Sequence, residues 1–309
     1  MILVAGSANL DFVVRANHIP LPGETVLGSD FQTFPGGKGA NQAVACARAG
    51  GVATHLLAAL GADPYALPLK SSLQAARVTL HEVAAPNLAT GVAFICVSRD
   101  GENAITVAPG ANTALLPSHL PPLDGFSHLL MQLETPLETV QAYAQAARAA
   151  GVEVVLNAAP AQALPPELLA ALDVLVVNQG ELESLAPGAG SIYERLRRLP
   201  VPAVVVTLGR RGCCARSGDQ YFWQPAFAVQ PVDTTGAGDT FCGALVAARS
   251  QGAEWPLALQ RASAAGALAC TRPGAQSSIP TTAEIHAFLA RQVAASPGDL
   301  QALQDYCST

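Results

Sequence analysis

The stretch Pro231-Val232-Asp233-Thr234-Thr235-Gly236-Ala237-Gly238-Asp239-Thr240-Phe241-Cys242-Gly243-Ala244-Leu245 says more about the fold and chemistry of this chain than any other. Two glycines and an alanine leave a short turn bare of side chains, and the apolar residues after it have helical spacing. Such a turn presents unpaired N–H groups and the positive end of a helix dipole, which suits phosphate. Asp239 then either takes a proton from an attacking hydroxyl or caps the helix. The segment alone leaves both interpretations open.

The composition is that of a large globular protein. The chain has 309 residues, of which 50% are hydrophobic and 13% charged, enough for one large domain with an insertion or for two domains. No apolar run approaches the roughly 18–20 residues of a membrane span, and the N-terminus lacks the basic start of a signal peptide. Seven cysteines without CxxC spacing predict reduced thiols and a cytoplasmic setting. A net charge of −6 argues against a nucleic-acid partner.

Apolar runs alternate with helical patterns along most of the chain. The expected strands are Ile2–Gly6, Thr54–Ala59, Leu129–Leu133, Val152–Asn157, Val174–Asn178 and Ala203–Leu208. The expected helices are Ala40–Ala49, Pro64–Ala76, Leu137–Ala150 and Glu181–Leu185, and Trp255–Val293 is mostly helical with a break at 272–274. This alternation predicts an α/β fold with a mostly parallel sheet between two helical layers. Ligands of such sheets bind at the C-terminal ends of the strands.

Two stretches without helical period, residues 12–35 and 91–109, interrupt this pattern. They contain short strand-like segments at Phe12–Val14, Thr25–Leu27, Val92–Ile95 and Ala104–Val107, joined by Gly, Pro and Asp turns. We interpret them as a small antiparallel β lid inserted near the N-terminus. The α/β core would then comprise residues 1–11, 36–90 and 110–309, while the tail from Ser296 carries no clear pattern.

A second glycine cluster, Pro35-Gly36-Gly37-Lys38-Gly39-Ala40-Asn41-Gln42, opens a helix after the first part of this insertion. It lacks the order of a Walker A loop. Three glycines let the backbone approach a ligand closely, while Lys38 supplies donors and Asn41 both donors and an acceptor. Polyhydroxylated ligands need this mixture, although a plain glycine turn before a helix has the same pattern.

Polar residues follow several of the expected strands. Asn9 and Asp11 follow the first strand, Glu134 follows a later one, and Asn178–Glu181 and Thr207–Gly212 follow two more. Each group alone is typical of a solvated loop or a turn. Because the strand ends of a parallel sheet meet at one edge, the groups together predict a single site.

These residues resemble the ribokinase-like carbohydrate kinases over nearly the whole chain. The resemblance is carried by Gly6–Asp11, Pro22–Val26, Gly36–Val44, Gly101–Asn103, Met131–Glu134 and Asp233–Asp239. It implies transfer of the ATP γ-phosphoryl to the 5-hydroxyl of D-ribose, which gives D-ribose 5-phosphate, in a protein that is not a nucleic-acid or membrane binder.

The resemblance also implies a role for each matching residue. Asp239 would be the base, and Gly236, Ala237 and Gly238 would form an anion hole. The sugar-binding residues would be Asn9, Asp11, Gly37, Lys38, Gly39, Asn41, Glu134 and Asp239. The ATP-binding residues would be Asn178, Thr207, Leu208, Gly209, Arg210, Arg211, Gly212, Gly238 and Ser263.

Two cations and a homodimer are further implications of the resemblance. Glu181 would hold Mg²⁺ through water, which suits an ion that takes few direct protein ligands. A monovalent cation, K⁺ in the family, would take ligands from Asp233, Thr235, Ala269, Arg272, Gly274 and Ser278. The lid would make the dimer contact. Gln179 departs from the usual acidic residue of the family at its position, which puts metal or phosphate handling there in question.

Alternative functions remain open from the sequence. A related kinase could act on fructose, a keto-deoxy sugar acid or a nucleoside, and an aromatic residue of the lid such as Phe12, Phe31, Phe34 or Phe94 could stack a base. The same phenylalanines equally suit a core or a dimer contact. A catalytically silent sugar-binding regulator is a third possibility, which the intact Gly236–Asp239 segment argues against.

Overall fold

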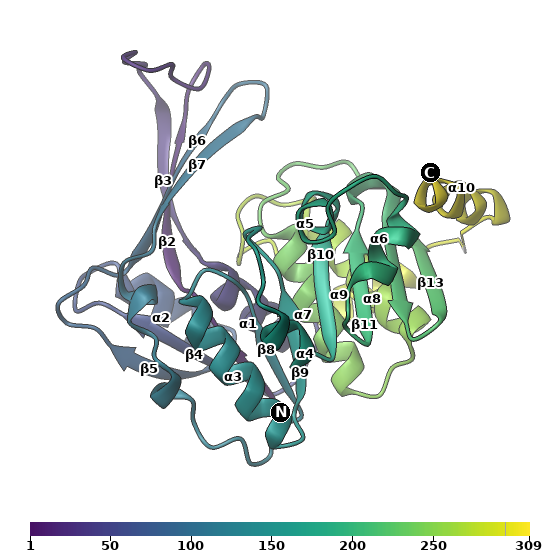
Figure 1. The fold of residues 1–309 in the computed structure, drawn as a ribbon. Helices are drawn as coiled ribbons and strands as arrows, with labels where there is room; N and C mark the ends of the chain where they lie inside the picture. The colour runs from purple at the N-terminus through teal and green to yellow at the C-terminus, as the bar shows by residue number, and fades with distance from the viewer. Residues whose placement is uncertain (294) are drawn as a thin grey trace.

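Two β-sheets organise residues 1–293 and 295–309, the part of the chain that the computed structural model describes (Figure 1). The large sheet has the order β13-β12-β11-β10-β9-β8-β1-β4-β5, and the small sheet has the order β3-β2-β6-β7. The strands of the large sheet are β1 (Ile2–Ala5), β4 (Thr54–Leu60), β5 (Thr79–Ala84), β8 (His128–Met131), β9 (Glu153–Asn157), β10 (Val174–Asn178), β11 (Ala203–Thr207), β12 (Gly212–Ser217) and β13 (Gln220–Pro225).

The large sheet is parallel from β5 through β11, and β12 and β13 add an antiparallel hairpin at one edge. All six strands expected from the apolar runs are present, and the predicted α/β class is confirmed. Sequence patterns missed the two edge strands, β5 and β13, because only the inner strands are buried on both faces and form continuous apolar runs. They also missed β12, which pairs with β13 and has a short buried stretch.

Helices cover both faces of the large sheet, which makes three layers (Figure 1). One layer contains α1 (Lys38–Arg48), α2 (Ala66–Ala75), α7 (Ala237–Ser250), α8 (Trp255–Ala269) and α9 (Thr282–Leu289). The other contains α3 (Leu137–Ala149), α4 (Pro166–Ala170), α5 (Gln179–Leu185), α6 (Ile192–Arg198) and α10 (Pro297–Ser308). Successive side chains of β1 point to opposite faces of the sheet, so Ile2 and Val4 pack on the first layer while Leu3 and Ala5 pack on the second.

The small sheet projects from the core beside the strand ends (Figure 1). Its strands are β2 (Asn9–Arg15), β3 (Ser29–Gly36), β6 (Gly91–Val97) and β7 (Asn103–Ala108). Its outer pairs are antiparallel as expected, but the central pair β2–β6 is parallel, because a long stretch of core separates the two strands in sequence. The expected strand at Thr25–Leu27 is wrong. That segment is extended without a partner strand, and Leu27 is 90% exposed.

The chain reverses its direction of travel across the sheet at β1. After β1 it moves to β4 and β5, and then returns to the other side of β1 at β8. The carboxyl ends of strands on either side of such a switch point diverge and leave a crevice for a ligand. Both glycine motifs start helices at this edge, since α1 follows Gly37 (φ +86°) and α7 follows Gly236 (φ +73°). A left-handed φ of this kind favours glycine.

Residues 255–293 are mostly helical as predicted, with α8 and α9 on either side of the expected break at 272–274. The tail after Ser296 forms one more helix, α10, which starts with a reciprocal hydrogen-bonded cap between Ser296 and Asp299. Among the helices that the structure describes, none is both long and apolar enough to span a bilayer.

Candidate active site

A cavity of about 170 Å³ lies where β9, β10 and β11 end and α7 begins. Side chains and backbone from both of the predicted subsites meet here. The cavity is lined by Lys38, Asn157, Ala159, Val176, Val177, Asn178, Glu181, Thr207, Gly236, Gly238, Asp239 and Cys242. Lys38 and Asp239 come from the predicted sugar side, while Asn178, Thr207 and Gly238 come from the predicted nucleotide side.

The carboxylate of Asp239 does not cap helix α7. Gly236 is the N-cap residue, and no side chain accepts a hydrogen bond from the helix start. Instead, Asn41 Nδ2 donates to Asp239 Oδ2 at 2.9 Å and Gln42 Nε2 donates to Asp239 Oδ1 at 2.9 Å. Both donors lie on α1, in the other glycine motif. The capping interpretation is therefore wrong, and two side-chain amides hold this carboxylate at the cavity wall.

The start of α7 presents backbone N–H groups to the cavity. The N–H of Ala237 is used, since it donates to the Thr234 carbonyl at 3.2 Å. The N–H groups of Gly238 and Asp239 have no acceptor among the described residues. A Cβ at Gly238 would meet no atom within 4 Å, so this wall of the cavity is open. Free amides at a helix N-terminus beside open space are suited to an anion.

Glu134 joins the glycine cluster at Gly36–Gln42 to the loop that follows β1. Its Oε2 accepts hydrogen bonds from Ser7 Oγ at 2.5 Å and from the backbone N–H of Lys38 at 3.1 Å. The Lys38 side chain forms no ion pair with any described residue. Burial by itself would lower the pKa of Lys38, but the carboxylates of Asp239 and Glu134 outweigh it and raise the pKa. The ammonium group therefore stays charged at neutral pH.

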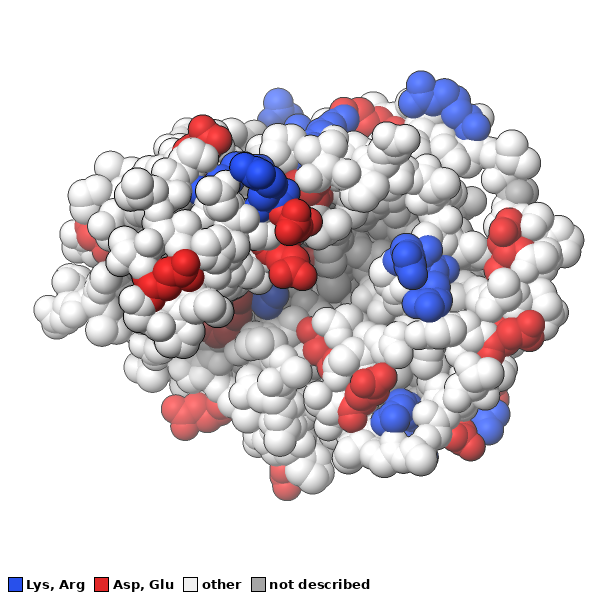
Figure 2. Space-filling view, turned by 90° about the horizontal axis from the view of Figure 1, so that it is seen from above, with Lys and Arg blue, Asp and Glu red and all other residues white. Residues whose placement is uncertain are grey.

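Asp11 lines a second cavity of about 400 Å³ between the small sheet and the loops at 231–235 and 273–275. Burial raises the pKa of Asp11 to about 7, and the nearby carboxylates of Glu134 and Asp239 add to the rise. The view from above shows a hollow with acidic and basic side chains on its rim (Figure 2). Asn9 lies deeper, where its Oδ1 accepts a hydrogen bond from Asn112 at 2.7 Å.

The predicted nucleotide residues occupy the ends of β10 and β11. Asn178 caps α5, because its Oδ1 accepts from the Glu181 N–H at 2.8 Å while Glu181 Oε2 accepts from the Asn178 N–H at 2.7 Å. Burial raises the pKa of Glu181. In the following turn Thr207 lines the cavity and Leu208 is buried in the core.

Two other parts of the predicted nucleotide set lie further out. Arg210 and Arg211 are exposed, in a turn bounded by Gly209 and Gly212, both of which have a left-handed φ. Ser263 on α8 is away from the cavity lining, with its hydroxyl 3.6 Å from the thiol of Cys213 at the start of β12. The structure therefore brings Asn178 and Thr207 to the cavity itself and places the arginines and Ser263 around it.

The two loops that carry the predicted monovalent-cation ligands are bound to each other. Asp233 Oδ2 accepts from the Gly274 N–H at 2.9 Å, and its Oδ1 accepts from the Thr235 N–H at 2.9 Å. These hydrogen bonds outweigh burial and lower the pKa of Asp233. Ser278 is buried nearby, and Ala269 and Arg272 lie at the end of α8. The donor set is carboxylate, hydroxyl and carbonyl oxygen, which fits a hard cation.

The lid phenylalanines divide between two faces. Phe12 stacks on Phe31 and on Phe94 at centroid distances of 6.0 and 5.5 Å. Alternation places these three on the face opposite to Val13 and Ile95, which line the Asp11 cavity. They are therefore turned away from the cleft, and none of the three can stack a nucleobase there. Phe34 does line that cavity.

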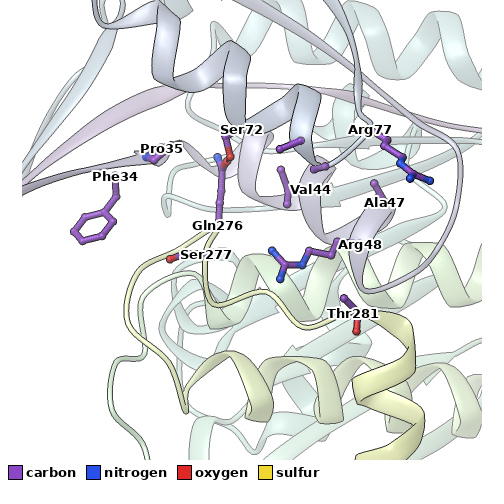
Figure 3. A pocket seen from close by; sticks show the side chains of 12 residues that line it. Phe34, Pro35, Val44, Ala47, Arg48, Ser72, Arg77, Gln276, Ser277 and Thr281 are labelled. Atoms are coloured by element: carbon purple, nitrogen blue, oxygen red, sulfur yellow. The ribbon is translucent and has the colours of Figure 1, made fainter.

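A separate cavity of about 520 Å³ lies between α1, α2 and the loop before α9 (Figure 3). Its side chains include Phe34, Arg48, Arg77 and Gln276, and it contains none of the predicted site residues. The two arginine side chains extend in opposite directions (Figure 3), so they do not converge on one anion. The chemistry of the smaller cavity around Asp239 makes that cavity the candidate active site.

Sequence reasoning missed the polar residues behind the site. Gln132 Nε2 donates to Gln42 Oε1 at 2.6 Å, and Gln42 Nε2 also lies 2.9 Å from Asn157 Oδ1. Gln132 and Asn157 stand at the ends of β8 and β9, so the rule that polar residues at strand ends form sites would have found them. Asn112 and Ser7 carried no comparable signal.

A polar cavity at the strand ends, open helix-start amides and a buried carboxylate define a small-molecule kinase of the three-layer α/β class. Comparison with known proteins identifies the family. The sequence model described as pfkB family carbohydrate kinase matches residues 1–282. The chain therefore belongs to the pfkB family of carbohydrate kinases, whose members are phosphotransferases.

Individual relatives cover almost the whole chain. The ribokinase of Haemophilus influenzae is 38% identical over 302 residues, which span 93% of this chain and 97% of the relative. The ribokinase of Bacillus subtilis is 36% identical, over 93% of this chain and 99% of the relative. The Arabidopsis thaliana ribokinase structure complexed with ribose and ATP superposes with a TM-score of 0.85 at 31% identity, and the match covers 94% of this chain and 99% of the other.

Proposed function

We propose that this chain is an ATP-dependent kinase that phosphorylates the 5-hydroxyl of D-ribose. The main support is the position of the Asp239 carboxylate, which Asn41 and Gln42 hold beside the free backbone N–H groups of Gly238 and Asp239. Base and anion hole thus share one cavity with residues of both predicted subsites. The relatives named ribokinase, and the solved ribokinase that holds ribose and ATP, support this assignment.

The proposed reaction is an in-line displacement. The ribose O5 attacks the γ-phosphorus of ATP, the bond from that phosphorus to the β–γ bridging oxygen breaks, and ADP leaves with the bond's electron pair. Of the anion hole expected at Gly236, Ala237 and Gly238, the Ala237 N–H is already paired with the Thr234 carbonyl. Asp239 accepts the proton of the hydroxyl, while the N–H groups of Gly238 and Asp239 stabilise charge on the transferring phosphoryl group. Lys38, which is charged and without an ion pair among the described residues, adds a positive charge to the same cavity.

Two cations would complete the site. Glu181 lines the cavity and offers a carboxylate for Mg²⁺ through water, and the ion would neutralise phosphate charge. Oxygen atoms of Asp233, Thr235, Ala269, Arg272, Gly274 and Ser278 would hold K⁺ beside the start of α7. The Asp233 hydrogen bonds to Thr235 and Gly274 keep these loops together, which supports this assignment.

The small sheet would act as a lid and as the dimer contact. Residues 12–35 and 91–109 would cover the sugar, and residues 1–11, 36–90 and 110–309 would form the kinase core. Closure would exclude water, which otherwise competes as phosphoryl acceptor. The outer face of the lid exposes Phe31 (64%) and Phe94 (54%), which supports burial against a second copy of this chain.

A cytoplasmic location accompanies this function. All seven cysteines are free, and five of them, at positions 46, 213, 214, 242 and 307, lie in the core of the large domain. Reduced, buried thiols are typical of proteins that fold in a reducing compartment.

An acceptor screen tests the assignment. Coupled ADP detection would compare D-ribose, 2-deoxy-D-ribose, fructose, ketodeoxygluconate, adenosine and no sugar at saturating ATP. We expect D-ribose to have the highest kcat/KM, and phosphorus NMR to place the phosphate on C5. Preference for another acceptor would reassign the substrate. ATP binding and ribose binding without any turnover would instead identify a silent regulator.

A further inference from the structure

The C-terminal helix α10 lies beyond the part of the chain that the family shares. The family match ends at residue 282, and α10 spans Pro297–Ser308. The helix packs against β13 and α6 at the sheet edge far from the lid (Figure 1). Leu303 and Cys307, both residues of α10, are buried in the core. A family member does not need this helix for its common chemistry, so its contacts with the rest of the chain call for an explanation.

One residue of α10 reaches both turns of the predicted nucleotide subsite. The hydroxyl of Tyr306 donates to Gln179 Oε1 at 2.9 Å, at the first residue of α5. The guanidinium carbon of Arg211 lies 4.0 Å from the centroid of the Tyr306 ring. Gln179 follows β10 and Arg211 follows β11, two neighbouring parallel strands. A single side chain therefore bridges the two strand-end turns from outside.

The contact with Arg211 adds a side-chain anchor to a turn whose backbone is already held, since the Leu208 N–H donates to the Gly212 carbonyl at 2.8 Å and the Arg211 N–H to the Leu208 carbonyl at 3.2 Å. Gly209 and Gly212 bound it with φ values of +55° and +113°. The Arg211 side chain makes no hydrogen bond or ion pair with any residue that the structure describes, so it is held by its contact with the Tyr306 ring. A guanidinium that stacks through its face keeps its edge N–H donors available. Stacking thus fixes the group without using up its donors.

The contact with Gln179 acts on the other turn. Gln179 is followed closely by Glu181, and Asn178 and Glu181 cap each other and line the cavity. Because Gln179 is neutral, it accepts the Tyr306 hydrogen bond without adding negative charge beside the phosphate site. An acidic side chain would also accept this bond but would repel the polyphosphate.

We propose that α10 is a nucleotide-side clamp, in which Tyr306 is a positioning residue that holds the Arg211 turn and the start of α5 in place for ATP. The clamp rests on the proposed function, since it concerns the ATP subsite of the same kinase. It acts on nucleotide binding and leaves the sugar subsite, at the far side of Asp239, unaffected.

The test compares Tyr306→Leu, Tyr306→Phe and Tyr193→Phe in the full-length protein. Tyr193 on α6 also contacts α10, through its hydroxyl and the Gln304 carbonyl at 3.4 Å, but touches neither turn. We expect Tyr306→Leu to raise the KM for ATP roughly fivefold, because it removes both contacts, with ribose KM and kcat nearly unchanged. Tyr306→Phe keeps the ring and loses only the hydrogen bond to Gln179, so it should raise the KM for ATP about twofold. Tyr193→Phe should lower the melting temperature without changing the KM for ATP.

Two results would overturn the clamp. One is an unchanged ATP KM in Tyr306→Leu, and the other is an equal rise in Tyr193→Phe, which would show that α10 acts only through stability. If Tyr306 and Arg211 act together, the double variant Tyr306→Leu/Arg211→Met should raise the KM for ATP over that of Arg211→Met alone by only about twofold, the share of the Gln179 hydrogen bond, and not by the roughly fivefold expected in the wild-type background. Direct calorimetric titration with ATP in the absence of sugar gives the same comparison. It separates failure of the clamp from failure of the ribose assignment, because it needs no turnover.

Discussion

Gln42 Nε2 lies 2.9 Å from Asp239 Oδ1 and ties the helix of one glycine motif to the carboxylate of the other. The two residues are far apart in sequence, and Gln42 is completely buried. Its Oε1 in turn accepts from Gln132 at 2.6 Å, so three elements share one polar chain. Buried networks of this kind rigidify a site when their members are satisfied. We infer that Gln42 holds the orientation of the base.

Replacing Gln42 tests that relationship. Gln42→Leu should lower kcat about tenfold, because Asp239 keeps one of its two side-chain donors and can rotate out of line. It should also lower stability by about 1–3 kcal/mol, since the amide of Gln132 loses its partner. The matched control Gln132→Leu disturbs the same chain one step further away and should reduce kcat less. Equal kcat losses in the two variants would argue for a general packing effect.

Asp239 itself should be replaceable with little loss of sugar binding. Asp239→Asn keeps the shape of the side chain and removes the proton acceptor, so we expect kcat to fall by about 10²–10⁴-fold. The dissociation constant for ribose, measured by calorimetry, should change only a few-fold. Turnover close to that of the wild-type protein would exclude Asp239 as the base.

The pH dependence of sugar binding should follow Asp11. Burial, aided by Glu134 and Asp239, raises its pKa to about 7 in the folded protein, above the ordinary value of 3.8. The ionised carboxylate accepts from sugar hydroxyls through both oxygens and with a full negative charge, whereas protonation turns one oxygen into a donor, so ribose KM should fall as the pH rises from 6 to 8. Asp11→Asn should raise ribose KM and remove this pH dependence. A wild-type ribose KM that is flat across this range would contradict the assignment.

The raised pKa of Asp11 also predicts that the stability of the folded protein depends on pH. Because the folded protein holds the Asp11 proton more tightly than the unfolded chain does, the stabilising contribution is complete below pH 3.8 and is lost as the pH rises through 7. Asp11→Asn, which carries no charge to bury, should therefore raise the melting temperature of the free protein more at pH 8 than at pH 5. Equal changes in melting temperature at the two pH values would count against a buried, protonated Asp11.

Most of the core could be predicted from the sequence because each buried strand is a continuous apolar run. β10 and β11, for example, begin and end at or within one residue of the predicted bounds. The edge strands β5 and β13 contain only exposed and half-buried residues and lack that signal. The parallel pairing of β2 with β6 depends on contacts between distant segments, which no local pattern records.

The site divides in a similar way. The glycine motifs indicated Lys38 and Asp239, which both line one cavity in the structure, because bare turns before helices are visible in sequence. The partners of Asp239 could not be chosen in advance, since Asn41 and Gln42 meet it only after α1 packs on α7. Arg211 lies in the Thr207–Gly212 turn, to which the resemblance assigns ATP binding. Its contact with Tyr306 depends on the tail after Ser296, for which the sequence showed no pattern.

Potassium dependence should require Asp233. Its carboxylate joins the Thr235 and Gly274 backbones, which carry predicted cation ligands. Asp233→Asn leaves one acceptor oxygen for the two backbone N–H groups that now donate to the carboxylate. The two loops should therefore separate, and K⁺ should activate the enzyme more weakly. Activity would be measured against KCl, with choline chloride at equal ionic strength as control. Equal K⁺ activation in wild type and variant would remove Asp233 from the cation site.

The outer face of the lid should be a dimer contact. Phe12, Phe31 and Phe94 form one stacked row on this face with Phe12 in the middle, and Phe94 at one end is 54% exposed. A stable protein rarely leaves such an aromatic row in water, because burial of about 100 Å² of apolar surface stabilises by roughly 2–3 kcal/mol. Phe94→Lys places a charge in the row and should convert a dimer into a monomer in light scattering coupled to gel filtration.

The strand alternation supplies the control for that experiment. Ile105 is similarly exposed, at 53%, but it pairs with Ile95 and so lies on the opposite face, toward the cleft. Ile105→Lys adds the same charge to the same sheet and should leave the dimer intact. If both variants dissociate, the charge destabilises the sheet as a whole. If neither does, the aromatic row is not the contact, and the lid must close over the sugar without help from a second copy.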